Sequence, residues 1–371
     1  MAMSSDAVSD PVSGTVPEAV PEAVPEVVIE HFVQQAGWCD DYGSPFTARL
    51  IERLARDIEA GGPTAALVAG PRARRADRLS LRIAGALHAA VLSGRDPALA
   101  AEYPAARPAW DMARVWPLVQ SFLARERAWI AGFLGSAPQT NETRRTIALL
   151  AGFLWLAARH DREIELLEIG ASAGLNLYWD RFAYRTASWR WGDGPVQIST
   201  EWTGAPPPLD AVPRIRARAA CDLNPIDIRD PGERLRLRAY IWADQAERLA
   251  LFDAAAAVAV GHDVRVERAD AAEWLEDRLP RRSPDALTVV YHSVFYQYPP
   301  TATRRRIADA IAQAGERSAA PLAWLRLEPE AVLGGPRDSD RFVVDLVTWP
   351  GAERRTLAAT DGHGRFVQSL G

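Results

Sequence analysis

The chain has 371 residues and no lysine, since all 43 of its basic residues are arginine. A protein without lysine cannot form a Schiff base, anchor pyridoxal phosphate or offer a P-loop lysine to a nucleotide, so these enzyme classes are excluded. A GC-rich coding sequence is enough to explain why arginine stands in place of lysine. Cysteine is also scarce. Cys39 and Cys221 are far apart and outside any C-x-x-C motif, so neither a disulfide framework nor a structural zinc site is expected.

The sequence also lacks metal-ligand pairs, membrane spans and an excess of positive charge. Its six histidines include no H-x-x-x-H pair, so no bound metal is expected. The longest apolar run, Ile147–Ala158, is too short to cross a bilayer, and no basic start with an apolar run marks a secretory signal. A net charge of −5 argues against a nucleic-acid surface. We expect a cytoplasmic protein with a small-molecule substrate and neither nucleic-acid nor membrane partners; the oligomeric state stays open.

Patterning divides the chain into three parts. Residues 1–27 repeat Val-Pro-Glu, and proline at every fourth position predicts a disordered or polyproline-II-like tail. Residues 28–160 predict an all-helical N-terminal domain. In residues 161–371 short apolar strands alternate with helices, which predicts an α/β domain with a Rossmann-like, mostly parallel sheet. A stretch rich in proline, glycine and tryptophan at about 184–213 breaks the alternation and predicts an inserted hairpin and loop.

Local rules predict individual boundaries. Ser44-Pro45 starts a helix that Gly61-Gly62 closes, and Pro117 is expected to kink or split a helix over 110–134. Antiparallel strands are expected to join the sheet edge at the C-terminus. The predicted strands are 164–169, 216–221, 264–267, 286–291, 322–327, 341–349, 354–360 and 365–370, and the predicted helices of the α/β domain lie near 233–252, 271–278 and 301–315.

The most informative segment is Glu165–Leu177, with the sequence Glu-Leu-Leu-Glu-Ile-Gly-Ala-Ser-Ala-Gly-Leu-Asn-Leu. It predicts a short apolar strand, an acidic residue, a glycine turn and the start of a helix. Backbone N–H groups and a helix N-terminus beside a carboxylate suit a ligand with a polar linker and a ribose.

Glu168, Gly170 and Gly174 match the pattern E-x-G-x-G-x-G, with the small Ser172 in the place of the middle glycine. The segment resembles motif I of class I S-adenosylmethionine-dependent methyltransferases. The resemblance covers residues 163–371 and implies a methyltransferase-like fold with S-adenosylmethionine held by Glu168, Gly170, Ser172 and Gly174. The turn is also similar to that of a bacterial family of unknown function, which supplies no activity.

The strands that follow extend the resemblance. Asp222, in Cys-Asp-Leu-Asn-Pro, is placed where that family's ribose-binding acid stands, and Asp270 where an aspartate recognises the adenine amino group. Tyr291 and His292 end the fourth strand over the methyl-transfer centre, and His292 could remove a proton from an acceptor. Ser293 and Tyr296 could line the same mouth.

Each of these residues also has a structural interpretation. Glu168 and Asp222 could pair or cap near helix ends, Asp270 could be the N-cap of the next helix, and His292 could be a hydrogen-bonded core histidine. Asp222 lies 54 residues after Glu168, where about 20 is usual. Its assignment therefore requires that the insert leaves the core of the sheet.

Gly170-Ala-Ser-Ala-Gly174 also matches the G-x-S-x-G elbow of serine hydrolases, with Ser172 as nucleophile, His363 as base and Asp345 or Asp340 as third member. Against this, the preceding 130 residues predict helices where the hydrolase fold needs strands, and no H-G-G-G oxyanion loop is present.

The favoured hypothesis is methyl transfer from S-adenosylmethionine to a small molecule, with a non-catalytic binding protein of the same fold as the alternative. The helical domain and the insert are expected to cover the carboxyl ends of the strands. The three indoles of the insert, Trp189, Trp191 and Trp202, suit either a flat ligand or the core of the insert itself.

Overall fold

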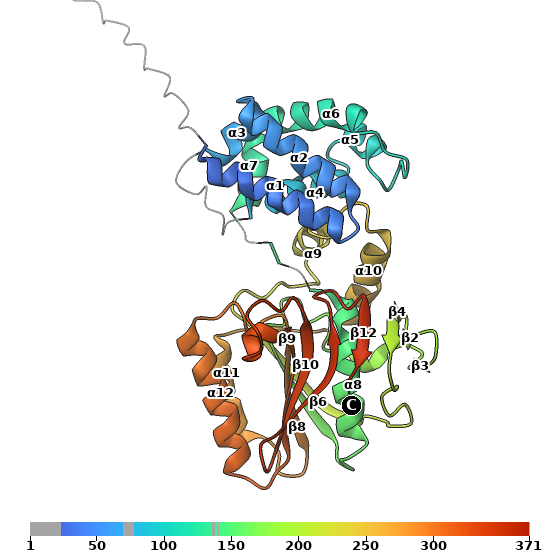
Figure 1. Ribbon diagram of the computed structural model, residues 1–371, viewed down its shortest axis with the longest axis vertical. Coiled ribbons are helices and arrows are strands. Elements are labelled where there is room, and N and C mark those ends of the chain that lie inside the picture. Colours follow the sequence, from blue (N-terminus) through green and yellow to red (C-terminus); the bar gives the residue numbers. More distant parts are fainter. Residues whose placement is uncertain (1–23, 70–77, 136–137, 140, 371) are drawn as a thin grey trace, which may run out of the picture.

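The computed structural model describes residues 24–69, 78–135, 138–139 and 141–370, and Figure 1 shows a helical region packed at one end of a large sheet. Most of the proline-rich tail lies outside the described residues, and the first helix begins at Glu26. The helices are α1 (Glu26–Asp41), α2 (Pro45–Glu59), α3 (Pro63–Val68), α4 (Leu79–Leu92), α5 (Pro97–Glu102), α6 (Met112–Arg125), α7 (Arg127–Leu134), α8 (Thr146–Ala157), α9 (Pro231–Ala239), α10 (Ala246–Gly261), α11 (Ala271–Arg278) and α12 (Thr301–Glu316), with short 3-10 turns η2 (Thr143–Arg145) and η3 (Trp179–Arg181).

Helices α1 to α7 form the predicted helical region around a core of their own. Helix α2 starts at Pro45 and ends before Gly61, which adopts a φ of +69°, as the sequence predicts. Helix α6 runs through Pro117 without a break, and the chain turns at Glu126 instead. The prediction that Pro117 splits the helix is therefore wrong. A proline removes one hydrogen bond, but the buried face of α6 holds the helix against its neighbours.

The nine strands of the main sheet lie in the order β5-β12-β11-β10-β9-β8-β1-β6-β7. Strands β7, β6, β1, β8 and β9 run parallel, while β10, β11 and β12 form an antiparallel meander at one side, with β5 added beyond β12. The predicted mixed α/β fold with antiparallel C-terminal strands is confirmed. The strands are β1 (Ile164–Ile169), β5 (Glu201–Thr203), β6 (Ile215–Asp222), β7 (Glu267–Arg268), β8 (Leu287–Ser293), β9 (Leu322–Pro329), β10 (Phe342–Trp349), β11 (Glu353–Thr360) and β12 (Phe366–Ser369).

Helices cover both faces of the sheet. Helices α8 and α10 pack on one face, and α11 and α12 on the other, so each face has its own hydrophobic core (Figure 1). Parallel sheets are stable only when both faces are covered in this way. The strands β1, β8 and β9 are accordingly buried along nearly their whole length.

Most of the insert lies outside the main sheet, as the assignment of Asp222 requires. Its strands β2 (Phe182–Arg185), β3 (Arg190–Trp191) and β4 (Val196–Ser199) form a separate small sheet, and only β5 returns to the main one. Trp189 and Trp202 pack edge to face at 4.9 Å between ring centroids, and Trp191 stacks on Trp179. This packing is the one expected if the indoles form the core of the insert.

Two predicted elements between β6 and β8 differ from the structure. The helix expected at 233–252 is two helices, α9 and α10, because Ala239 and Ala243 turn away to pack in the helical region. The strand expected at 264–267 is reduced to the two residues of β7. A strand at the sheet edge has only one neighbour to pair with, which keeps it short.

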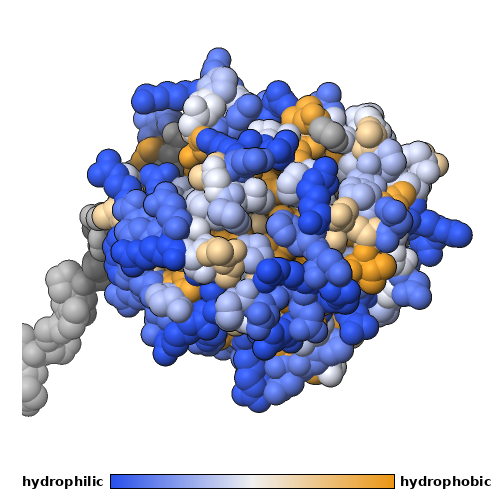
Figure 2. All heavy atoms as spheres, turned by 90° about the horizontal axis from the view of Figure 1, so that it is seen from below, coloured by the Kyte–Doolittle hydropathy of each residue, from blue (hydrophilic) through white to orange (hydrophobic). Residues whose placement is uncertain are grey.

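Figure 2 shows the face of the molecule opposite the helical region. Hydrophilic side chains dominate it, and hydrophobic residues are scattered between them rather than gathered in one area. Isolated apolar residues of this kind are ordinary on a soluble surface.

Candidate functional site

Strands β1 and β8 mark the point where the order of the parallel strands reverses. From β1 the chain proceeds outward to β6 and β7, and then returns to the other side of β1 to form β8 and β9. In open α/β sheets ligands bind at such a point, outside the carboxyl ends of the strands. Glu168 of β1 and Tyr291 of β8 are direct neighbours there.

Glu168 and Tyr291 form a buried hydrogen-bonded pair. The Tyr291 hydroxyl donates to Glu168 Oε2 at 3.0 Å, and both side chains are almost fully enclosed. Burial raises the pKa of Glu168 to about 8; the bond from Tyr291 opposes this and the charge of Asp222 adds to it. Glu168 Oε1 has no hydrogen-bond partner among the described residues. A cationic group placed beside it would favour the ionised carboxylate.

The glycine turn has three residues in the left-handed region: φ is +67° at Gly170, +54° at Ser172 and +68° at Gly174. Glycine adopts this conformation freely, whereas at Ser172 it is uncommon. The Ser172 N–H donates to Asp222 Oδ2 at 2.9 Å, and the Asn224 N–H donates to Oδ1 at 2.8 Å. Asp222 therefore lies against the turn despite the distance in sequence.

No helix follows the glycine turn, so this part of the prediction is wrong. The N–H groups at the end of the turn already have partners within the protein. Gly174 donates to the Ala171 carbonyl, and Leu175 donates to Oδ1 of the distant Asn141 at 3.0 Å. These contacts favour a series of tight turns that ends in η3, where the large buried ring of Trp179 anchors the chain. The turn consequently offers a ligand two carboxylates but no helix N-terminus.

Phe295 covers the turn from the β8 side. A Cβ added at Gly170 would lie 2.2 Å from the Phe295 ring, so the absence of a side chain at Gly170 allows this ring to approach the backbone. A ligand on the Cβ side of Gly170 would have to displace Phe295. At Gly174 the space for a Cβ is taken by Val264 at 2.7 Å, which makes that glycine a packing requirement.

Asp270 lies directly after β7 and caps the following helix. Its Oδ1 accepts the N–H groups of Ala272 at 2.9 Å and Glu273 at 3.2 Å. This is the N-cap arrangement that the sequence also suggested. Its position beyond the end of β7 places it on the same edge of the sheet as Asp222, whose carbonyl accepts the Ala269 N–H.

His292 lies inside the sheet rather than at the mouth. It is fully buried, its Nδ1 lies 2.7 Å from Glu328 Oε1, and its Nε2 accepts the Trp324 indole N–H at 3.2 Å. Burial is the main cause that lowers its pKa below the usual value. Both ring nitrogens are engaged, so a role in proton transfer stays a prediction from the sequence, on which the proposal below does not depend.

The hydrolase interpretation needs a histidine bonded to Ser172, and the structure does not assemble one. The Ser172 hydroxyl is buried without a hydrogen-bond partner within the described residues. Asp345 is occupied by the guanidinium groups of Arg326 and Arg354. The geometry favours the interpretation of the turn as a ligand-holding element.

A family described as an uncharacterized protein conserved in bacteria, DUF2332, matches residues 29–369. The chain belongs to this family. The expected membership in a bacterial family of unknown function is confirmed. No curated protein and no solved structure matches the DUF2332 chain.

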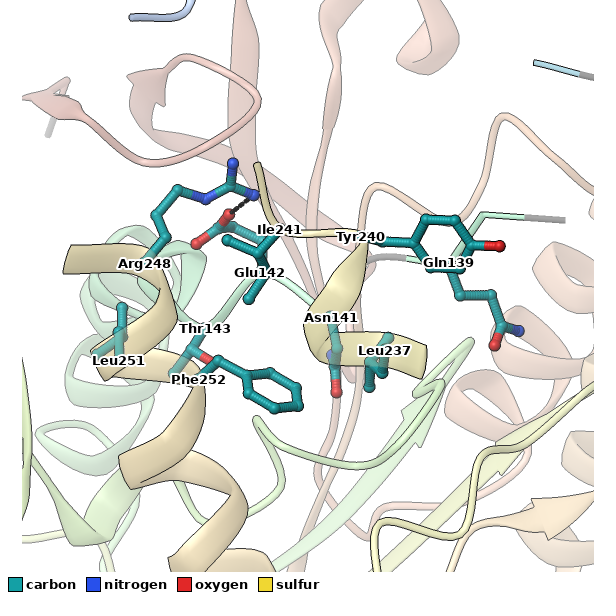
Figure 3. A pocket seen from close by; sticks show the side chains of 10 residues that line it. All are labelled: Gln139, Asn141, Glu142, Thr143, Leu237, Tyr240, Ile241, Arg248, Leu251 and Phe252. Atoms are coloured by element: carbon teal, nitrogen blue, oxygen red, sulfur yellow. Dashed lines mark ion pairs between the residues drawn. The ribbon is translucent and has the colours of Figure 1, made fainter. Parts of the chain in front are cut away.

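A cleft between the helical region and the sheet adjoins the glycine turn. It consists of cavities of about 760 Å³, beside Asn224 and Tyr240, and about 330 Å³, beside Arg248 and His363. A third space of about 10 Å³ shares Tyr240 with the first cavity and Arg248 with the second. Figure 3 shows the side chains that line this third space and the ion pair between Arg248 and Glu142. The sequence did not indicate the cleft, because its walls come from segments far apart in the chain.

Two further properties of the DUF2332 chain bear on its chemistry. Among the residues that the structure describes, no three histidine, cysteine, aspartate or glutamate side chains gather as metal ligands would. The described helices include none with the length and apolar character that crossing a membrane demands.

Proposed function

We propose that the DUF2332 chain binds S-adenosylmethionine at the carboxyl edge of β1 and β6 and transfers its methyl group to a small molecule in the adjoining cleft. One observation carries the proposal: the Asp222 carboxylate is hydrogen-bonded to the glycine turn at the point where the order of the parallel strands reverses. An acid and a turn in this relation suit a ribose and its polar linker.

The residues present fit the ligand at two places. Each Asp222 oxygen accepts one backbone N–H, which leaves acceptor capacity for two ribose hydroxyls. Glu168 Oε1 has no partner among the described residues and could face a positive charge, such as an ammonium or sulfonium group. The ligand fits beside Gly170 only if the Phe295 ring moves, because this ring fills the space there. Phe295 is half-buried, so rotation of its side chain is the change that binding requires.

The chain's own contribution would be binding and alignment. S-adenosylmethionine supplies an electrophilic methyl group when it is bound. Asp222 would orient the ribose, and Glu168 would hold the cationic end in a site from which water is largely excluded. Alignment of two reactants can supply most of a rate enhancement without a protein base. An acceptor would occupy the larger cavity, which is lined by Asn224, the residue whose N–H is bonded to Asp222.

One observation favours the alternative of binding without transfer: the predicted base, His292, has no free ring nitrogen. The two functions differ in one measurement. A transferase forms S-adenosylhomocysteine when small acceptors are supplied, whereas a binding protein shows the same affinity and forms none.

Calorimetry on a matched pair of variants tests the binding site. Asp222→Ala is expected to weaken S-adenosylmethionine binding by about tenfold to a hundredfold, because hydrogen bonds to a charged group contribute roughly 1.5–3 kcal/mol. Asp210→Ala removes an exposed carboxylate of the insert and should leave the affinity unchanged. Equal affinity in Asp222→Ala and the native chain would show that Asp222 does not contact the ligand.

A further inference from the structure

The cavity of about 330 Å³ at the far end of the cleft has features of a second ligand site. Its walls come from four parts of the chain: the loop before α2, the η2 turn, the start of α10 and the turn between β11 and β12. Tyr42, Arg144, Arg248 and His363 are among the residues that line it. Its volume is in the range of small-molecule sites.

Two of the three acidic groups that line this cavity are held by other parts of the protein, and the third, Glu247, is exposed to solvent. Asp244 accepts the Phe46 N–H at 2.9 Å and the Ser44 hydroxyl, at the N-terminus of α2. The buried carboxylate of Glu142 pairs with Arg248 at 2.6 Å. A carboxylate held by an arginine or by a helix N-terminus has little charge left to repel an anion.

Two arginines beside the cavity keep hydrogen-bonding capacity. Arg145 is half-buried, and its Nε donates to the Gly362 carbonyl at 2.7 Å. Within the described residues it has no carboxylate at ion-pair distance, and burial lowers the pKa of its guanidinium. Arg144 has only a 3.5 Å contact with Glu247, whose side chain is 92% exposed and therefore well solvated. Both guanidinium groups can donate further hydrogen bonds.

His363 places a neutral imidazole in the same cavity. Its ring packs against Tyr42 at 4.9 Å between centroids, and its Nδ1 is buried without a hydrogen-bond partner among the described residues. Burial lowers the pKa of His363 to about 4, and the charges of Arg248 and Arg145 act in the same direction. A buried nitrogen with no partner costs free energy unless a ligand or water satisfies it.

We propose that this cavity binds the anionic group, a carboxylate or a phosphate, of a small molecule through Arg144, which lines it, with His363 facing the ligand and Arg145 adding positive charge from outside the lining. A guanidinium presents a planar fork of N–H donors that matches both kinds of anion. Arg145 lies behind this lining, where its Nε donates to the carbonyl of Gly362, the residue before His363, at 2.7 Å. The site stands independently of the S-adenosylmethionine proposal.

Calorimetry with inorganic phosphate and with succinate, on the full chain at low ionic strength and pH 7, tests this site. We expect at least one anion to bind, and its affinity to fall about tenfold or more in Arg144→Gln and by a smaller factor in Arg145→Gln. Arg281→Gln is the matched control, because Arg281 lines a different cavity, and it should bind like the native chain. Preference for phosphate or for succinate identifies which anionic group the site takes.

The His363 ring gives a second readout by nuclear magnetic resonance, with His363→Gln to assign its signals. An added anion among Arg144, Arg145, Arg248 and Arg365, opposite Glu142, Asp361 and Tyr42, should raise the pKa of His363. If Arg145→Gln does not fold, Arg144→Gln and this signal decide. Absence of binding at about 10 mM of either anion, or equal affinity in the native chain and both arginine variants, would overturn the proposal.

Discussion

The substitution Glu168→Gln should remove a pH dependence from the stability of the protein. In the folded chain, burial raises the pKa of Glu168 from 4.5 to about 8, while the unfolded chain keeps the ordinary value. Between these two pH values the folded state holds a proton that the unfolded state has released. The contribution of Glu168 to stability is therefore greatest below pH 4.5 and declines as the pH rises toward 8, the sign expected for a carboxyl group with a raised pKa.

The magnitude follows from the same values. Each pH unit between 4.5 and 8 costs the folded state about 1.36 kcal/mol, so the whole interval amounts to about 5 kcal/mol. This is a large fraction of the 5–15 kcal/mol that is typical of folded proteins. Glutamine cannot ionise, and its amide can still accept the Tyr291 hydroxyl, so the variant should lose this decline while keeping the hydrogen bond.

Urea unfolding at pH 5, 6, 7 and 8 measures the difference between Glu168→Gln and the native chain. The variant should gain stability relative to the native chain by about 4 kcal/mol between pH 5 and pH 8. Glu165→Gln, in the same strand but partly exposed, is the control and should follow the native pH dependence. Parallel stability curves for Glu168→Gln and the native chain would refute the raised pKa and the buried site built on it.

Two further substitutions test the packing of the sheet. Asp345→Ala should cost about 3–5 kcal/mol in urea unfolding, because it leaves the buried guanidinium of Arg326 without its carboxylate; a loss below about 1 kcal/mol would show that this charge finds another partner. Gly315→Ala should lower stability by about 1–3 kcal/mol in thermal unfolding, although alanine favours helix, because the new Cβ would lie 2.3 Å from the Trp349 ring. A neutral effect would mean that α12 and the indole separate without cost.

The fold was predictable where one pattern dominates. The residues of β1, β8 and β9 form apolar runs, and the sequence placed all three strands within two residues of their observed ends. The prediction was wrong where tertiary contacts decide the outcome. The helix expected after Gly174 is replaced by tight turns, in which the Leu177 N–H donates to the Gly174 carbonyl, and Asn141, a residue before the sheet begins, accepts the Leu175 N–H. Nothing in the local sequence indicates that contact.

The candidate site shows the same division. Glu168 and Asp222 could be selected from the sequence, because each stands at the carboxyl end of a strand, the edge at which open α/β sheets bind ligands. The cover that Phe295 provides over Gly170 could not, since it depends on the path of the chain after β8. The arginines beside His363 were also missed, because over 200 residues separate Arg145 from the carbonyl of Gly362 to which it donates.

The most direct test of the proposed function is isothermal titration of the full chain with S-adenosylmethionine and S-adenosylhomocysteine. The account predicts saturable binding of one ligand per chain with a dissociation constant below about 1 mM, the upper end of the usual range of enzyme affinities for substrates. Absence of binding for both ligands at millimolar concentration would contradict the account. The glycine turn and Asp222 would then be structural features of the sheet edge.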